Sequence, residues 1–434
     1  MAKEIYKPSQ YNIILTPISN AVYTYIYNTK SGAIIKLEKP LYELIEKSAF
    51  EATSLQSLLS DLLKQGIVVP KNKNELNEII FFEKVSQFNL NFQTLTLIIA
   101  PTLKCNYKCV YCFEDNQNTS PAIMSGPTIT DIVSFADTFI KENPQLKKLK
   151  IHWFGGEPLL GYQDVIVPLS EKLIELTQIH NIDYEAGIVT NGYLLSPEIL
   201  DNLIRLLKIY SFQITFDGQK YNYEKLKRPP KRAYEKAKDN ILYLSEYIHD
   251  TKQKVQVNIR INVEKDNAND SALFYSEIKN NSRYKNNFNF YLGRLRSIVP
   301  CDDYLTLSEF EDIEQKFNDV IKKQVRLINP KKIWCSQYTM GCLCIGPEGE
   351  LYKCEHDFGV NERVIGNVID GIDYPQFLLD YFNMPIDQAC KECNIYPICL
   401  GGCPNARFVN KYHCEYTIKK IINNACNYIT SQKY

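Results

Sequence analysis

Leu103-Lys104-Cys105-Asn106-Tyr107-Lys108-Cys109-Val110-Tyr111-Cys112-Phe113 decides the fold, because it places three cysteines on one short loop with the spacing C-x3-C-x2-C. The loop follows an apolar, strand-like segment at 95–100. A cubane [4Fe–4S] cluster that is ligated only by protein takes four cysteines. Three thiolates would hold three irons and leave the fourth iron open for a small molecule. Half of a zinc site and coincidence are the competing interpretations of the loop taken alone.

The length and composition predict a multidomain globular protein. The chain has 434 residues, of which 45% are apolar and 23% charged, so two to four domains are expected. Lys plus Arg equals Asp plus Glu at 50 each, and no global field attracts nucleic acid or an anionic membrane. Residues 1–7 have no apolar core, and no apolar run reaches the length of a membrane span. A cytoplasmic protein without nucleic-acid or membrane partners is expected.

The fourteen cysteines are clustered along the chain. Three lie between 105 and 112, ten lie between 335 and 426, and only Cys301 stands apart. Disulfides are rare in a reducing cytosol. The clustering therefore indicates metal ligation.

The pattern of apolar residues predicts an α/β fold. Six strand-like segments alternate with helical ones, which implies a parallel sheet with right-handed crossovers and a partial (β/α)6 TIM-like barrel. The expected strands are 94–100, 149–154, 185–189, 211–216, 255–263 and 288–292, and the expected helices are 128–142, 162–179, 196–208, 234–248 and 270–279.

The remaining segments predict further domains. Strands at 22–27 and 33–37, a helix from Pro40, an apolar helical stripe at 55–63 and a strand at 67–69 suggest a small winged-helix-like α+β unit. Its alternatives are a structural cap and a module that binds peptides by β-addition. The expected domains are 1–92 (winged-helix-like), 93–300 (barrel), 301–330 (helical bridge) and 331–434 (Cys-rich).

Four further motifs follow the predicted barrel strands. They are Gly155-Gly156-Glu157-Pro158, Thr190-Asn191-Gly192, Thr215-Phe216-Asp217-Gly218 and Arg260 in the fifth strand. Together with the cysteine loop they resemble the radical S-adenosylmethionine (SAM) enzymes. Glycines let a backbone carbonyl approach an ammonium closely, and a carboxylate accepts charge-assisted hydrogen bonds from it. A strand end or turn with a solvated polar residue is the alternative for each motif.

This resemblance implies a role for each motif. Cys105, Cys109 and Cys112 would hold the SAM-binding cluster, and the GGEP residues, with Glu157 foremost, would bind the methionine amino group of SAM. Thr190 and Asn191 would lie near the ribose of SAM, and Arg260 would pair with its carboxylate. Asp217 is the one candidate for a catalytic acid or base.

The C-terminal cysteines resemble the seven-cysteine SPASM domain, which carries two auxiliary [4Fe–4S] clusters. The pattern is Cys335-x13-Gly349-x4-Cys354, then Cys390-x2-Cys393-x5-Cys399-x3-Cys403, and later Cys414. Two clusters need eight thiolates, and Cys342 and Cys344 are the candidates for the eighth. The resemblance implies one set of Cys335, Cys342, Cys354 and Cys403, and another of Cys390, Cys393, Cys399 and Cys414. Cys344 in place of Cys342, or an open iron, remains an alternative. Cys426 is expected to be a core thiol.

The resemblance also implies the chemistry, in which a 5′-deoxyadenosyl radical formed from SAM abstracts hydrogen from an unactivated carbon. Residues 1–92 favour a maturase of ribosomally made peptides, which installs a thioether or carbon–carbon cross-link and binds a leader at the strand edge near 22–27, beside a helix at 54–65. The expected cofactors are three [4Fe–4S] clusters and SAM, and the expected partners are a precursor peptide and a flavodoxin- or ferredoxin-type electron donor. The alternatives are a formylglycine-generating sulfatase maturase and a non-catalytic iron–sulfur protein.

Overall fold

The computed structural model describes most of the chain in two compact units. Unit 1 combines residues 1–89, 323–339 and 381–434, and unit 2 combines residues 90–322 and 340–380. The described residues are 5–47, 50–51, 58–114, 122–265, 267–281, 288–295, 305–410 and 414–432. Cys301 and the expected helical residues 54–57 lie outside them. No described helix has the length and apolar character needed to cross a membrane.

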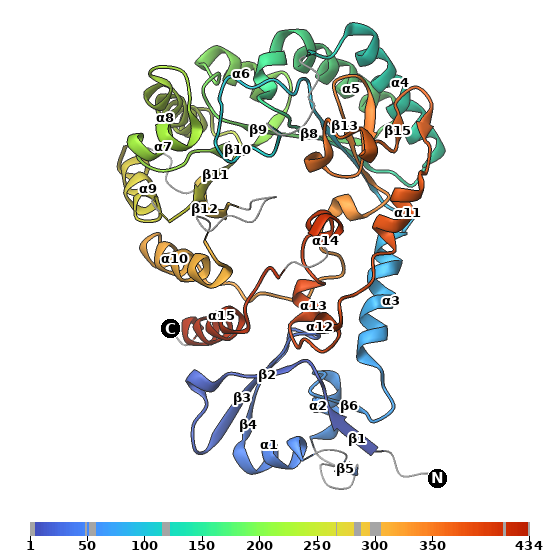
Figure 1. The fold of residues 1–434 in the computed structure, drawn as a ribbon, viewed down its shortest axis with the longest axis vertical. Coiled ribbons are helices and arrows are strands. Elements are labelled where there is room, and N and C mark those ends of the chain that lie inside the picture. The colour runs from blue at the N-terminus through green and yellow to red at the C-terminus, as the bar shows by residue number, and fades with distance from the viewer. Residues whose placement is uncertain are drawn as a thin grey trace. The chain divides into compact units, whose positions relative to one another are not determined.

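Unit 2 is built on a ten-stranded sheet in the order β12-β11-β10-β9-β8-β7-β13-β14-β15-β16 (Figure 1). The strands from β7 to β12 are all parallel, which confirms the predicted α/β barrel-like architecture. These strands are β7 (Thr94–Ile99), β8 (Lys148–Trp153), β9 (Asp183–Thr190), β10 (Ile209–Thr215), β11 (Gln256–Val263) and β12 (Phe288–Arg294).

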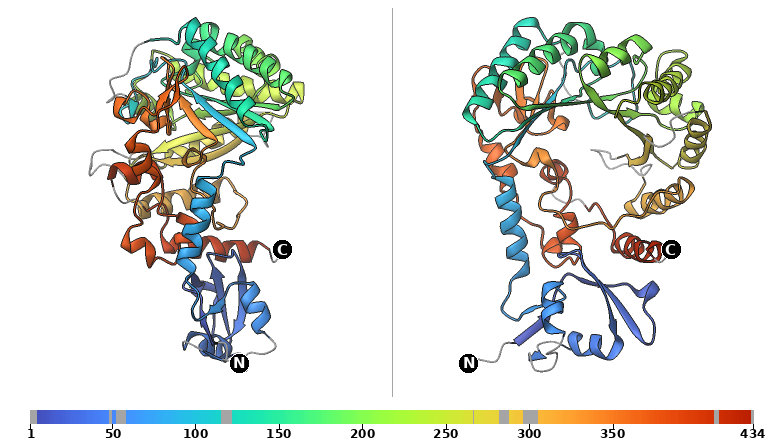
Figure 2. Two further views of the ribbon diagram at one scale, coloured as in Figure 1. Left: turned by 90° about the vertical axis from the view of Figure 1, so that its right-hand side faces the viewer. Right: turned by 180° about the vertical axis from the view of Figure 1, so that it is seen from behind.

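Helices cover the outer side of this curved sheet (Figure 2). Some of them begin at a side-chain cap: Ser125 and Ser196 each accept a backbone N–H at the start of a helix, as N-cap residues do. The helices are α4 (Gly126–Glu142), α5 (Val167–Ile179), α6 (Pro197–Arg205), α7 (Lys220–Lys227), α8 (Ala233–Thr251), α9 (Asp270–Asn281) and α10 (Leu307–Val320). The helix expected at 162–179 starts with a π-helical turn at Tyr162–Ile166, and α7 was not predicted.

Part of the Cys-rich segment extends the barrel sheet. β13 (Cys342–Ile345) pairs in parallel with β7, and β14 (Glu350–Tyr352), β15 (Gly366–Asn367) and β16 (Gly371–Ile372) follow in antiparallel order. Cys342 and Cys344 are buried with Ile98, Leu103 and Phe358 in one apolar cluster. A segment expected in a separate domain therefore completes the edge of the barrel sheet.

Unit 1 holds the N-terminal residues and most of the C-terminal cysteines. Its N-terminal elements are β1 (Ile5–Pro8), β2 (Asn12–Ile14), β3 (Tyr23–Asn28), β4 (Ile34–Glu38), α1 (Lys39–Glu46), β5 (Phe50–Glu51), α2 (Leu59–Lys64), β6 (Val68–Pro70) and α3 (Glu75–Gln87). Its C-terminal helices include α12 (Gln388–Lys391), α13 (Tyr396–Cys399), α14 (Pro404–Asn410) and α15 (Ile418–Ser431). Ile13 and Tyr27 share an apolar core with Ile398, Ile421 and Cys426. Cys426 is therefore a core thiol, as predicted.

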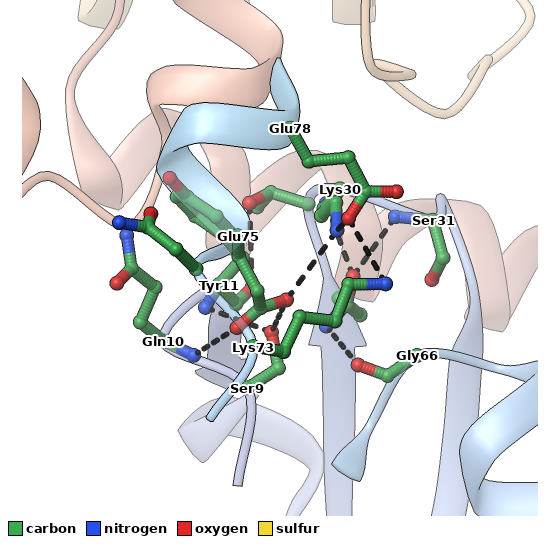
Figure 3. Close-up of polar contacts among 12 residues, drawn as sticks. Ser9, Gln10, Tyr11, Lys30, Ser31, Gly66, Lys73, Glu75 and Glu78 are labelled. Atoms are coloured by element: carbon green, nitrogen blue, oxygen red, sulfur yellow. Dashed lines mark hydrogen bonds and ion pairs between the residues drawn. The ribbon is translucent and has the colours of Figure 1, made fainter. Parts of the chain in front are cut away.

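A polar cluster fixes the start of α3 against the β3–β4 turn (Figure 3). Glu75 is buried and accepts hydrogen bonds from Ser9 Oγ at 2.8 Å and Gln10 N at 3.1 Å. Glu78 forms ion pairs with Lys30 at 2.8 Å and Lys73 at 2.9 Å. The N-terminal elements are thus one folded body that also supports the cysteine-bearing helices of unit 1.

The predicted peptide-binding edge at 22–27 is wrong, because β3 is the central strand of its sheet. β2 and β4 pair with it on its two sides. Beyond the end of β2, Leu15 N donates to Tyr25 O at 2.8 Å, and Asn20 N donates to Tyr23 O at 2.9 Å. A strand whose backbone is used on both sides cannot accept a further strand. The two edge strands of this sheet are β2 and β4, and β4 has the longer edge.

Candidate functional site

The cysteine loop leaves the carboxyl end of β7, the place where parallel α/β sheets bind their ligands. Cys105 is exposed, whereas Cys109 and Cys112 are partly exposed. The next side chain, Phe113, packs against His356, with 4.2 Å between the ring centroids. Three accessible thiols on one loop suit a cluster with three protein ligands.

The GGEP motif lies directly against this loop. Gly156 N donates to Thr102 O at 3.3 Å, and Glu157 N donates to Lys104 O at 2.8 Å. A Cβ atom on Gly156 would lie 2.2 Å from Lys104 O, and one on Gly155, which has a φ of +107°, would lie 2.5 Å from Thr102 O. Only glycine permits such a close approach of two backbone segments. Both glycines therefore position the motif against the loop.

Glu157 connects the GGEP motif with the Thr190-Asn191 motif at the end of β9. Its carboxylate accepts hydrogen bonds from Thr190 Oγ1 at 2.8 Å, Asn191 N at 2.8 Å and Leu159 N at 3.2 Å. The side chain is buried, and this burial raises its pKa to about 7, although the three hydrogen bonds act to lower the pKa. Pro158 is also buried and begins the turn at 158–161 that follows. The structure thus brings the predicted cofactor-binding residues of two strands together.

The polar side chains beside the loop fit a bound polar group. Asn191 Nδ2 donates to Asn106 Oδ1 at 2.7 Å and lies 4.0 Å from Cys105 Sγ. Asn106 Nδ2 is buried and has no hydrogen-bond partner among the described residues. A buried amide donor without a partner is costly, so a bound acceptor would stabilise it. Three thiols, a buried carboxylate and this donor match the chemistry expected of a cluster with SAM.

Arg260 lies within β11, and Asp217 follows shortly after the end of β10. Arg260 Nε donates to Asn262 Oδ1 at 2.9 Å. The guanidinium lies over Gly293, and a Cβ atom on this glycine would be only 2.7 Å from Arg260 Nε. Asp217 is fully buried, and both of its oxygens have protein partners. Since Asp217 presents no free oxygen to a substrate, its geometry favours a positioning role over proton transfer.

We expect Glu157→Gln to weaken SAM binding while the iron content stays unchanged. The variant keeps the shape of the side chain and removes its charge, and one hydrogen bond to a charged group is worth about 1.5–3 kcal/mol. Isothermal titration of the reconstituted protein with SAM measures the affinity. An unchanged affinity would remove Glu157 from the binding site.

One of the two predicted auxiliary sets is assembled within unit 1. Cys390, Cys393, Cys399 and Cys414 line a single cavity of about 40 Å³. No three His, Cys, Asp or Glu side chains in the described ranges converge closely enough to hold a single metal ion. The thiolates of a cubane bind different irons, so they need not converge on one point. The set fits a cluster, although its role as ligand stays a prediction.

The other predicted set is divided between the two units. Cys335 and Cys403 belong to unit 1, whereas Cys342, Cys344 and Cys354 belong to unit 2. Burial raises the pKa values of Cys344 and Cys354 well above the ordinary thiol range, and each of these two has a neighbouring cysteine that contributes. For Cys354 one such neighbour is Cys344. On this proximity we predict Cys344, rather than Cys342, as the eighth ligand.

Replacing these two cysteines one at a time tests this assignment. We expect Cys344→Ala to remove up to about four irons per chain, because a four-iron cluster loses a ligand. Cys342→Ala, two residues away on the same strand, should keep its iron and serves as the matched control. Iron analysis with Mössbauer spectroscopy measures both. The reverse pattern would return the assignment to Cys342.

The residues that hold the cysteine loop were not predicted from the sequence. Tyr107 and Tyr111 lie between the cysteines, and their hydroxyls bind Tyr223 and Asp217, respectively. Lys227, the last residue of α7, is buried beside Tyr111. The two tyrosines between the ligands were a visible signal, but their partners are more than 100 residues away and only the fold reveals them.

Comparisons with known proteins agree with this site. Residues 99–262 match the model of the Radical SAM superfamily. "Radical SAM cyclopropyl synthase TigE" of Paramaledivibacter caminithermalis is 25% identical over 44% of this chain and 41% of its own length, so the match spans less than half of that relative. "Cysteine-type anaerobic sulfatase-maturating enzyme" of Clostridium novyi is 24% identical over 72% of this chain and 88% of its own length.

A solved structure shows the same fold. The structure of anSMEcpe with bound AdoMet covers 78% of this chain and 97% of its own, with a TM-score of 0.55 and 16% identity. The matched segment 99–262 contains the three-cysteine loop, GGEP, Thr190, Asn191, Asp217 and Arg260. Residues 99–262 therefore form a domain of the Radical SAM superfamily, whose members are enzymes, and the C-terminal Cys-rich region fits a SPASM domain.

Proposed function

We propose that this enzyme is a maturase that modifies a ribosomally made precursor peptide by installing a thioether or carbon–carbon cross-link. The observation that carries the proposal is the small α/β fold before the barrel, because chemistry on a free small molecule needs no such addition. An open strand edge is a common receptor for an extended peptide. The names of two relatives, a cyclopropyl synthase and a sulfatase-maturating enzyme, support a modification reaction of this class.

The radical SAM domain would hold its cofactors with the residues described above. Cys105, Cys109 and Cys112 would ligate the cluster. Glu157 would accept a hydrogen bond from the ammonium of SAM, and Thr190 and Asn191 would hold the carboxylate of Glu157 in place. When bound, the cluster and SAM supply a 5′-deoxyadenosyl radical. The protein orients the carbon that loses hydrogen and keeps water from the radical. Two auxiliary clusters in the Cys-rich region would bring the total to three.

The edge of β4 is the surface that we assign to the leader of the precursor. Asn28 N donates to Ala33 O, and Lys39 N donates to Val22 O, each at 2.9 Å. In the antiparallel register of β3 and β4, these bonds direct the odd-numbered residues from 33 to 39 toward β3. The backbone N–H and C=O groups of Ile34, Lys36 and Glu38 therefore face outward, where an added strand would pair with them.

A sulfatase maturase that oxidises Cys or Ser to formylglycine is the second candidate. The observation in its favour is the match over 88% of the Clostridium novyi sulfatase-maturating enzyme. Such an enzyme would process a short C/S-x-P-x-R peptide without a leader. The two functions therefore differ in how turnover depends on sequence outside the modified residues.

The deciding experiment compares three peptides with the intact, reconstituted enzyme. These are a full precursor encoded beside the gene, its free core segment and a short C/S-x-P-x-R peptide. Mass spectrometry measures the product, and an isolated leader is added in trans as a competitor. We expect modification of the precursor, much weaker modification of the core, and inhibition by the leader. Formylglycine formed in the short peptide would establish the second candidate instead.

A further inference from the structure

The hydroxyl of Tyr111, between two cluster cysteines, meets three polar groups from distant parts of the barrel. It is hydrogen-bonded to Asp217 Oδ2, receives Lys227 Nζ at 3.2 Å and receives Asn262 Nδ2 at 3.1 Å. Asn262 N also donates to Asp217 Oδ1 at 3.0 Å. The cysteine loop is therefore fastened at its centre to the ends of β10 and β11 and to α7.

The same helix holds the backbone of the loop. Lys108 N donates to Lys227 O at 3.2 Å, and Val110 N donates to Leu226 O at 2.9 Å. The last carbonyls of a helix lack partners within the helix and are satisfied from outside. The loop supplies these partners from residues on both sides of Cys109, so α7 determines where that thiol lies.

The buried charge in this anchor needs a separate explanation. Lys227 and Asp217 lie 3.6 Å apart, and their side chains are only 2% and 0% exposed. A buried ion pair is often no more stabilising than apolar residues of similar volume. The neighbouring contact of Tyr107 with Tyr223, whose hydroxyls lie 2.7 Å apart, shows that this loop is also held without charge. An anchor alone does not require an ammonium and a carboxylate.

The two charges act on groups of the cofactor site. Both charged groups contact the hydroxyl of Tyr111, which lies between the predicted cluster ligands Cys109 and Cys112. Lys227 also acts against the raised pKa of Glu157. The potential of an iron–sulfur cluster depends on the net charge and hydrogen bonds around its sulfurs. A cation at this place favours the cluster form that carries one more electron.

We propose that Lys227 and Asp217 are positioning residues that set the reduction potential of the Cys105/Cys109/Cys112 cluster, with Tyr111 holding both against the loop. Lys227 stabilises the reduced cluster, and Asp217 limits this effect. The pair thereby balances the ease of reduction against the reducing power needed to cleave SAM.

The test measures the potential of this cluster in full-length, anaerobically reconstituted protein. A redox titration follows the EPR signal that changes when SAM is added. We expect Lys227→Met to shift the equilibrium between the oxidised and the reduced cluster toward the oxidised form. The equilibrium constant should change by about tenfold or more, because charges interact strongly in a protein interior. Asp217→Asn should shift it in the opposite direction. The double variant, which removes both charges, should fall between them.

Opposite signs distinguish an electrostatic role from a structural one, which would move both variants in the same direction. Unchanged potentials, or shifts of the same sign, would overturn the proposal. If Lys227→Met does not retain its iron, the potential of Asp217→Asn tests the proposal by itself. An unchanged or lower reduction potential in Asp217→Asn would contradict the proposal. Lys227→Arg keeps the charge and should restore the potential lost in Lys227→Met.

Discussion

Replacing Cys105, Cys109 and Cys112 together with Ala is expected to remove about four irons per chain and to abolish formation of 5′-deoxyadenosine. The three thiols lie on one loop that GGEP contacts through two backbone hydrogen bonds, so the cluster that they would hold lies beside the predicted SAM-binding motif. Iron analysis and chromatography of SAM cleavage products, with dithionite as reductant, measure both effects.

The matched control is Cys426→Ala, which also removes a thiol. Cys426 is buried in the apolar core with Ile421 and Ala425, so the variant should keep its full iron content and its SAM cleavage. A triple variant that still cleaved SAM would show that the loop does not hold the reactive cluster. Loss of all iron would instead mean that the loop is needed for folding of the whole chain.

The sequence predicted the barrel well because its signals are local. The six parallel strands fall within a few residues of their expected positions, since each is a short apolar run that a helical pattern separates from the next. The cysteine loop, GGEP and Thr190-Asn191 were recognised for the same reason. Parallel strands bring their carboxyl ends together, which is why Glu157 contacts Thr190 and Asn191 although they are far apart in sequence.

The remaining features depend on pairing between distant segments. β13 joins β7 although more than 240 residues separate them, and no local pattern distinguishes an added strand of the sheet from a loop with two cysteines. Asp217 is a candidate for a catalytic acid or base in the sequence, whereas its burial beside Lys227 favours a positioning role. The expected edge at β3 was wrong because the pairing of the short β2 strand is not visible in its three residues.

We expect Lys36→Pro in β4 to reduce turnover of the precursor strongly while free core peptide and unproductive SAM cleavage are unaffected. The N–H of Lys36 faces away from β3, so proline removes a group that β3 does not use, and proline is tolerated on edge strands for this reason. A docked leader would lose one hydrogen bond and meet the proline ring. The loss of about 1 kcal/mol or more corresponds to a several-fold to tenfold rise in KM for the precursor.

Lys36→Thr is the control for this prediction. Both variants lose the Lys36 ammonium, which lies 3.7 Å from the centre of the Tyr23 ring, but only proline lacks the N–H. A point variant is preferable to deletion of the N-terminal residues, because Ile13 and Tyr27 form a core with Ile398 and Ile421, which deletion would uncover. Equal loss in both variants would mean that the lysine side chain matters rather than strand pairing. Wild-type turnover of the precursor by Lys36→Pro would exclude leader docking at β4 and favour a function that needs no leader.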